Sequence, residues 1–111
     1  MSEGQIDLAA MMAKAQELSE RVRRAQEELR HRTVSATVGG GLVEVSANGA
    51  LELVGVRIDP QAVDPRDVAM LQDLVRAAAN QALARAKELA QETLQRATGL
   101  PLPFGPGGGH E

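Results

Sequence analysis

The sequence predicts an α+β fold in which a small antiparallel sheet of three strands lies between two long helices. Two observations carry this prediction. Residues 39–60, GGGLVEVSANGALELVGVRIDP, form a compact block with the alternation and turn signals of β-structure. The segments before and after this block are charged, rich in alanine and periodic at helical spacing. We therefore expect the order α-β-β-β-α in one domain over residues 1–99.

The first helix is expected over about residues 5–32. Its apolar residues recur at steps of three and four, at Leu8, Met11, Ala15, Leu18, Val22, Ala25 and Leu29. This spacing is typical of the a/d seam of a coiled coil, whose side chains pack against a partner helix. The first helix is therefore expected to pair with another helix.

Three strands are expected over about residues 33–38, 42–47 and 50–58. The first alternates Val and Ala with Thr and Ser, and the glycines at 39–41 give a loose connection to the second. Asn48-Gly49 predicts a two-residue hairpin turn with positive φ at both residues. Gly55 interrupts the alternation of the third strand, which predicts a β-bulge or a close backbone approach there.

The second helix is expected over about residues 65–98, with Asp64 as its N-cap and Pro65 at its first position. Gly99, with Pro101 behind it, is expected to end the helix. Along one side lie small and apolar residues that let another helix approach closely: Leu71, Val75, Ala78, Ala82, Ala86 and Leu89. The tail at 100–111, LPLPFGPGGGHE, is expected to be disordered because it is rich in Pro and Gly.

Length and composition predict that a second chain completes the core. The chain has 111 residues with one Phe and no Trp or Tyr, so it holds little bulky apolar material. Each predicted helix would span roughly 40 to 50 Å, longer than a globule of this size is wide. We therefore expect a symmetric homodimer.

The residues give little support for catalysis, a cofactor or a metal site. The two histidines, His31 and His110, lack the neighbours that a catalytic base needs. The glycines at 39–41 are not followed by the Lys-Ser or Lys-Thr of a phosphate-binding loop, and the acidic residues lack metal-ligand spacing. The absence of cysteine excludes disulfides and a thiolate metal site and leaves the redox compartment open. Without a signal peptide or a membrane span, the expectation is a cytoplasmic protein, and it is not expected to be an enzyme or to have a small-molecule substrate.

Basic residues gather on the helices, whereas the strands and their loops are acidic. On the first helix an acid precedes a base by four positions in Glu17–Arg21, Glu20–Arg24, Glu27–His31 and Glu28–Arg32. Such pairs stabilise an exposed helix, so charge alone favours a solvated, salt-bridged face over a nucleic-acid surface. The net charge of −3 also argues against strong indiscriminate DNA binding.

The combined motifs, however, resemble the YbaB/EbfC family of bacterial nucleoid-associated proteins. The resemblance rests on AQEEL at 25–29, GGGLVEVSANG at 39–49, RIDP at 57–60 and DPRDVAMLQDLVRAAANQAL at 64–83. It implies a tweezers-like homodimer in the nucleoid whose projecting helices bind double-stranded DNA through basic residues.

The residues expected to contact DNA are Lys14, Arg21, Arg23, Arg24 and Arg30 on the first helix and Arg85 and Lys87 on the second. The alternative is a dimeric coiled-coil scaffold or clamp that binds a protein partner, which suits the apolar seam and the charge-paired helices.

Overall fold

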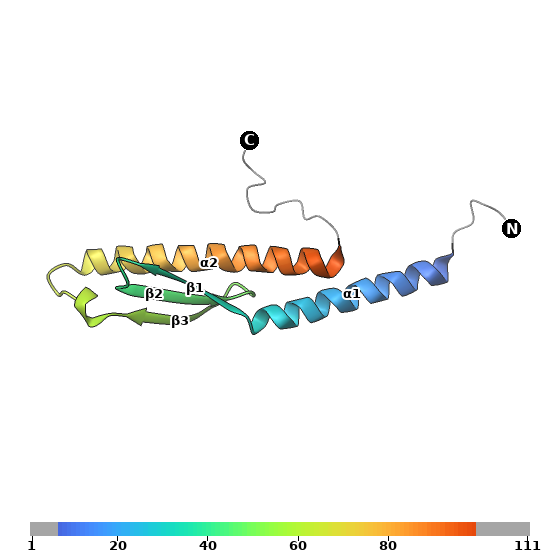
Figure 1. Cartoon of the computed structure of the whole chain (residues 1–111), viewed down its shortest axis with the longest axis horizontal. Helices are drawn as coiled ribbons and strands as arrows, with labels where there is room; N and C mark the ends of the chain where they lie inside the picture. The colour runs from blue at the N-terminus through green and yellow to red at the C-terminus, as the bar shows by residue number, and fades with distance from the viewer. Residues whose placement is uncertain (1–6, 100–111) are drawn as a thin grey trace, which may run out of the picture.

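The computed structural model describes residues 7–99 and has the predicted order of elements (Figure 1). The elements are α1 (Leu8–Arg30), β1 (Thr33–Val38), β2 (Val43–Asn48), β3 (Leu53–Ile58), the short 3-10 helix η1 (Pro60–Ala62) and α2 (Val68–Thr98). The predicted α+β class, with three antiparallel strands between two long helices, is confirmed. The tail at 100–111 lies outside the described residues.

The core lies between α2 and one face of the sheet. The strands pair antiparallel in the order β1-β2-β3, and α2 packs across β1 and β2 (Figure 1). The contact is made of small side chains, and its fully buried members are Val43, Val45 and Ala47 on β2 and Ala78, Ala82 and Ala86 on α2. Alanine has little volume beyond the backbone, so the helix lies close to the strands. The side of α2 predicted to be apolar is therefore the side that faces the sheet.

Helix α1 packs against α2 with only half of its apolar seam. The two helices run antiparallel, with the C-terminal half of α1 beside the C-terminal half of α2 (Figure 1). Ala25 and Leu29 are buried in this contact, whereas Leu8 is 68% exposed and Met11 57%. The partner helix expected for the seam is thus supplied in part by the same chain, and the N-terminal half of α1 has no partner within residues 7–99.

The predicted two-residue turn at Asn48-Gly49 is wrong. Strand β2 ends at Asn48 and β3 begins only at Leu53, so the third strand starts three residues later than expected. The side-chain Oδ1 of Asn48 accepts the N–H groups of Ala50 and Glu52, both at 3.0 Å. The non-glycine residue with positive φ is Leu51, at 65°. Asn48 therefore shapes a longer loop through its side chain and does not adopt the left-handed conformation itself.

Asn48 and Gly49 instead cap the C-terminus of α1. The last carbonyls of a helix have no partner within it. Here the Gly49 N–H donates to the carbonyl oxygens of Leu29 (2.9 Å) and Arg32 (3.1 Å), and the Asn48 amide donates to that of Arg30 (3.2 Å). A Cβ added to Gly49 would lie 2.9 Å from the Leu29 carbonyl oxygen and closer still to its side chain. Glycine is required at 49 because the loop touches the helix end, not because of its φ.

The other two glycine features also have defined geometry. Gly39, Gly40 and Gly41 all have positive φ, at 66°, 69° and 101°, so the connection from β1 to β2 is a specific turn that only glycine makes without strain. The predicted bulge in β3 is confirmed beside Gly55. Ser46 pairs with Gly55 and Ala47 with Leu53, which leaves Val54 as the extra residue.

Helix α2 begins later than predicted and ends as predicted. Its N-cap is Asp67, whose carboxylate accepts the Met70 N–H at 3.1 Å. Asp64 instead closes a turn, since its carbonyl accepts the Asp67 N–H at 2.9 Å and Pro65 suits the second position of such a turn. At the other end Gly99 has φ 72° and donates to the Gln95 carbonyl at 2.8 Å, which is a left-handed C-cap.

The contact between Gly49 and α1 predicts a steric cost. Gly49→Ala should lower the free energy of unfolding by on the order of 1 to 3 kcal/mol, because the new methyl group overlaps Leu29. The matched control is Gly55→Ala, where the added Cβ would meet only the Ser46 Cβ at 3.9 Å and φ is not positive. Thermal melting followed by circular dichroism compares the two variants. Equal melting temperatures would contradict this account of Gly49.

Candidate nucleic-acid interface

The arginines predicted to contact DNA on α1 lie on its exposed surface, each paired with a glutamate. Their side chains are 55% to 72% exposed. Arg21 binds Glu17 at 2.9 Å, and Arg30 lies 3.4 Å from Glu27. All four acid–base pairs expected from the sequence form: Glu17–Arg21, Glu20–Arg24, Glu27–His31 and Glu28–Arg32. The outer face of α1 is therefore a continuous line of ion pairs.

Glu20 holds two arginines at once. Arg23 donates hydrogen bonds to both oxygens of its carboxylate, and the Arg24 Nε lies 3.4 Å from one of them, Oε2. The hydrogen bond and positive charge of Arg23, and to a lesser degree those of Arg24, lower the pKa of Glu20 below its ordinary value. The carboxylate is thus ionised at neutral pH. Because the Glu20 side chain is 44% exposed, solvent screens much of the attraction, and another anion can replace the glutamate.

The remaining predicted contacts differ from these arginines. Lys14 and Lys87 are exposed and make no ion pair with any residue in 7–99. Arg85 donates a hydrogen bond to the Ser35 carbonyl and so ties α2 to β1. Among the seven residues, Arg85 is therefore the one whose guanidinium is engaged with the backbone of the fold.

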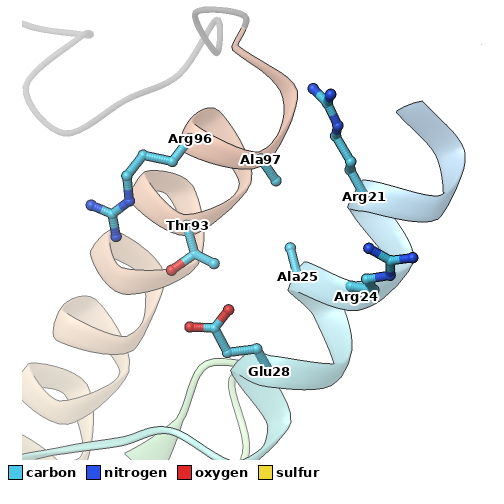
Figure 2. Close-up of a pocket in the computed structure, with 7 residues that line it drawn as sticks. All are labelled: Arg21, Arg24, Ala25, Glu28, Thr93, Arg96 and Ala97. Atoms are coloured by element: carbon cyan, nitrogen blue, oxygen red, sulfur yellow. The ribbon is translucent and has the colours of Figure 1, made fainter. Parts of the chain in front are cut away.

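Two of the α1 arginines meet a further arginine across the contact between the helices. Arg21 and Arg24 line a groove of about 340 Å³ with Arg96 from the last turn of α2. We call this the α1–α2 groove; its other lining residues are Ala25, Glu28, Thr93 and Ala97. In Figure 2 Glu28 reaches from α1 toward Thr93, Arg21 and Arg24 extend from α1, and the guanidinium of Arg96 lies on the side of α2 that faces away from α1.

Arg96 was not among the residues predicted from the sequence. Its position in the last turn of α2 indicates only a favourable interaction with the helix dipole. Its proximity to Arg21 and Arg24 follows from the antiparallel packing of helices that are far apart in the sequence. No signal in the local sequence predicts that packing.

Thr93 is buried beside this groove with an unsatisfied hydroxyl. The residue is 6% exposed, and its Oγ1 has no hydrogen-bond partner. It is the one side-chain polar atom of this kind within residues 7–99. Buried polar groups are almost always hydrogen-bonded, so this unpaired hydroxyl is an exception that costs the folded state free energy.

The described residues offer no arrangement suited to metal binding. No three side chains of His, Cys, Asp or Glu within 7–99 are grouped to hold a metal ion. His31 is the C-cap residue of α1, with its side chain 72% exposed and 3.5 Å from Glu27, and His110 lies outside the described residues. Neither helix in this part of the chain combines the length and apolar character needed to span a bilayer.

The chain is similar to bacterial nucleoid-associated proteins. A profile described as the YbaB/EbfC DNA-binding family matches residues 3–100. A nucleoid-associated protein of Moorella thermoacetica is 49% identical over 96 residues, which is 86% of this chain and 92% of the relative. A nucleoid-associated protein of Pelotomaculum thermopropionicum is 45% identical over 98 residues, covering 87% and 93%.

A solved structure shares the fold. The crystal structure of an uncharacterized protein from Helicobacter pylori superposes with a TM-score of 0.69, covering 79% of this chain and 92% of that chain. Its sequence identity to this chain is 22%, so the likeness concerns the arrangement of helices and strands alone.

The unsatisfied hydroxyl predicts an unusual stabilising substitution. Thr93→Val keeps the branched shape and removes the buried polar group, so the free energy of unfolding should rise by about 1 kcal/mol. Thr98→Val is the matched control on the same helix, because the Thr98 hydroxyl donates to the Gln95 carbonyl at 3.4 Å and that contact would be lost. A lower melting temperature for Thr93→Val would contradict the assignment of an unsatisfied group.

Proposed function

Because the chain belongs to the YbaB/EbfC DNA-binding family, we propose that it binds double-stranded DNA as a homodimer through basic residues on its helices. The proposed place of action is the bacterial nucleoid in the cytoplasm, where the protein contributes to nucleoid organisation or gene regulation. The chain is not assigned to an enzyme family, and we propose no catalytic role for it. The observation that carries the proposal is a row of exposed arginines on a helix that extends beyond the sheet. The row consists of Arg21, Arg23, Arg24 and Arg30.

The shape of α1 supports contact with a duplex. Its N-terminal half extends past the end of α2 and away from the sheet (Figure 1). This arm carries Lys14, and Arg21, Arg23, Arg24 and Arg30 follow nearer the sheet. Two such arms in a symmetric dimer would present basic residues to both sides of a duplex. Contacts of this kind are made to phosphates and position the protein without reading sequence.

Binding would occur by exchange of anions. Each arginine in the row already holds a glutamate, so a DNA phosphate must replace a carboxylate. Exposed ion pairs contribute little stability, and a phosphate, like a carboxylate, offers an arginine two oxygens in the geometry that its planar group prefers, so the exchange keeps the same kind of contact. Affinity would then depend strongly on salt, because each phosphate that is neutralised releases counterions.

The homodimer is supported by apolar surface on β3. Val43, Val45 and Ala47 on β2 are fully buried under α2. Their neighbours on β3 are Ile58, Val56 and Leu53, which face the same side but are 37%, 53% and 47% exposed. Strand β3 is also an edge of the sheet, with no strand on its outer side within residues 7–99. An exposed apolar edge strand favours association with another chain.

The salt-bridged face also supports a second candidate function. A dimeric coiled-coil scaffold or clamp for a protein partner would need the apolar residues of α1, and its charged face would serve only to keep the helix solvated. Leu8, Met11 and Met12 are 68%, 57% and 64% exposed, which suits such a partner. This alternative predicts no binding to duplex DNA even at low salt.

The dimer is tested at β3. Val56→Lys should convert a dimer into an 11.7 kDa monomer, because the charge would be buried in the interface. In a monomer the same change would be almost silent, since Val56 is half-exposed. Thr37→Lys, on an exposed position of β1, is the control and should remain dimeric. Light scattering that finds the parent protein monomeric, or the Val56 variant still dimeric, would refute this interface.

DNA binding is tested by removing three arginines from the exposed surface of α1. Changing Arg23, Arg24 and Arg30 to Gln removes six charges per dimer and keeps helix-forming side chains. The slope of log affinity against log salt should become shallower by up to about five units, because about 0.9 counterion is released per phosphate. Circular dichroism should show unchanged folding, since the three side chains are exposed.

A matched triple variant controls for net charge. Arg57, Arg66 and Arg76 are 71%, 92% and 73% exposed on the sheet and near the start of α2, and each is paired with an acid. Their change to Gln removes the same charge and should leave the salt slope of the parent. If both triple variants lose the same DNA affinity and salt slope, the effect is one of net charge alone. If the parent protein binds no DNA, the scaffold function is favoured.

A further inference from the structure

The α1–α2 groove gathers positive charge from both helices. Arg21 and Arg24 from α1 and Arg96 from α2 are among its lining residues, together with the single carboxylate of Glu28, and the Arg96 guanidinium is turned toward the outer side of α2 (Figure 2). Arg21 and Arg24 are balanced by Glu17 and Glu20, so the arginine of the groove whose charge no ion pair within residues 7–99 balances is Arg96. The facing residues of the two helices are small, Ala25 and Ala97, which leaves the space between them open (Figure 2).

We propose that the α1–α2 groove binds a backbone phosphate of duplex DNA and that Arg96 is the residue that anchors it. The inference rests on the proposed function and adds to it a specific site, formed by two helices, and a contact residue outside the row on α1. Its ligand is the phosphodiester group, whose oxygens match the planar fork of a guanidinium.

Arg96 differs from Arg21 and Arg24 in having no ion pair that a phosphate would have to break. Arg21 and Arg24 each hold a glutamate of their own helix, and a phosphate must displace that glutamate first. Arg96 makes no ion pair with any described residue in 7–99, so its contact with a phosphate breaks no existing pair. Arg96 has a long side chain that can turn toward α1, and a phosphate held by it in that position would lie beside Arg21 and Arg24 and draw them from their glutamates.

Two further residues of the groove fit an anion. Thr93 has the unsatisfied hydroxyl, and rotation about its χ1 exchanges the hydroxyl with the methyl group, which turns a neutral donor toward the groove. Glu28 opposes an anion, but it lies 3.3 Å from Arg32, which balances part of its charge. The carboxylate of Glu28 would therefore lower the affinity of the groove for a phosphate without preventing binding.

Arg96 also has a purely structural explanation, which the experiment must separate from binding. A basic side chain in the last turn of a helix stabilises that turn through the helix dipole. This role predicts a lower melting temperature when the charge is removed, and no change in the salt dependence of DNA binding. The proposed contact instead predicts that removing the charge changes the salt dependence of DNA binding.

The test measures the binding of a short duplex by the full-length protein at several salt concentrations. Arg96→Gln should make the slope of log affinity against log salt shallower by about one unit for each groove that is occupied, equally on all duplex sequences. Arg96→Lys should retain the slope, because the charge is kept. Glu28→Gln should bind more tightly than the parent, and Thr93→Val more weakly despite its higher stability.

The control is Arg76→Gln, near the start of α2. Arg76 is 73% exposed and pairs with Asp73, so the substitution removes the same charge from the same helix far from the groove. A parent that binds DNA, with equal slopes for Arg96→Gln and Arg76→Gln, would overturn the groove and leave the proposed function intact. A parent that binds no duplex at low salt would overturn the proposed function, and the groove with it.

A second measurement distinguishes the source of the phosphate. Melting of the parent and of Arg96→Gln is compared in inorganic phosphate and in chloride at equal ionic strength. Stabilisation by phosphate that Arg96→Gln loses, together with unchanged duplex binding by that variant, would assign the groove to a free anion and overturn its role in DNA binding.

Discussion

The close contact of α2 with the sheet is the constraint on which the rest of the structure depends. It is made by alanines on α2, among them Ala82, against small residues of β2 such as Val45. Burial of apolar surface drives this packing, and small side chains bring the helix axis near the strands. The contact fixes the direction of a helix that is much longer than the sheet it covers. Every other surface of the protein is placed relative to that helix.

Two consequences follow from the length and position of α2. Because it lies over β1 and β2, it leaves apolar residues of β3 such as Val56 uncovered, and this surface supports the proposed dimer. Because it continues beyond the sheet, its C-terminal turns meet α1 at Ala25 and Leu29, and Arg96 lines the same groove as Arg24. The groove proposed as a phosphate site therefore arises from the same contact as the core.

The electrostatics of α1 are a competition between glutamates and an external anion. Exposed pairs such as Arg21–Glu17 keep the helix soluble and solvated, and they contribute little to its stability. Glu20 illustrates this competition, since one partly exposed carboxylate pairs with both Arg23 and Arg24, and the hydrogen bond and charge of Arg23 lower its pKa. A protein with this surface would bind a polyanion reversibly and with strong dependence on salt, which suits a molecule that must associate with and leave DNA.

The sequence by itself determined the features that depend on near neighbours in the chain. Helical spacing predicted the four ion pairs of α1, Gly99 predicted the end of α2, and the lost alternation at Gly55 predicted the bulge. Only the tertiary structure decided that Asn48 and Gly49 cap α1, that β3 lies uncovered, and that Arg96 joins the groove. The reason is physical: these contacts join residues far apart in the chain, and a helix side lined with alanine does not specify which surface it will meet.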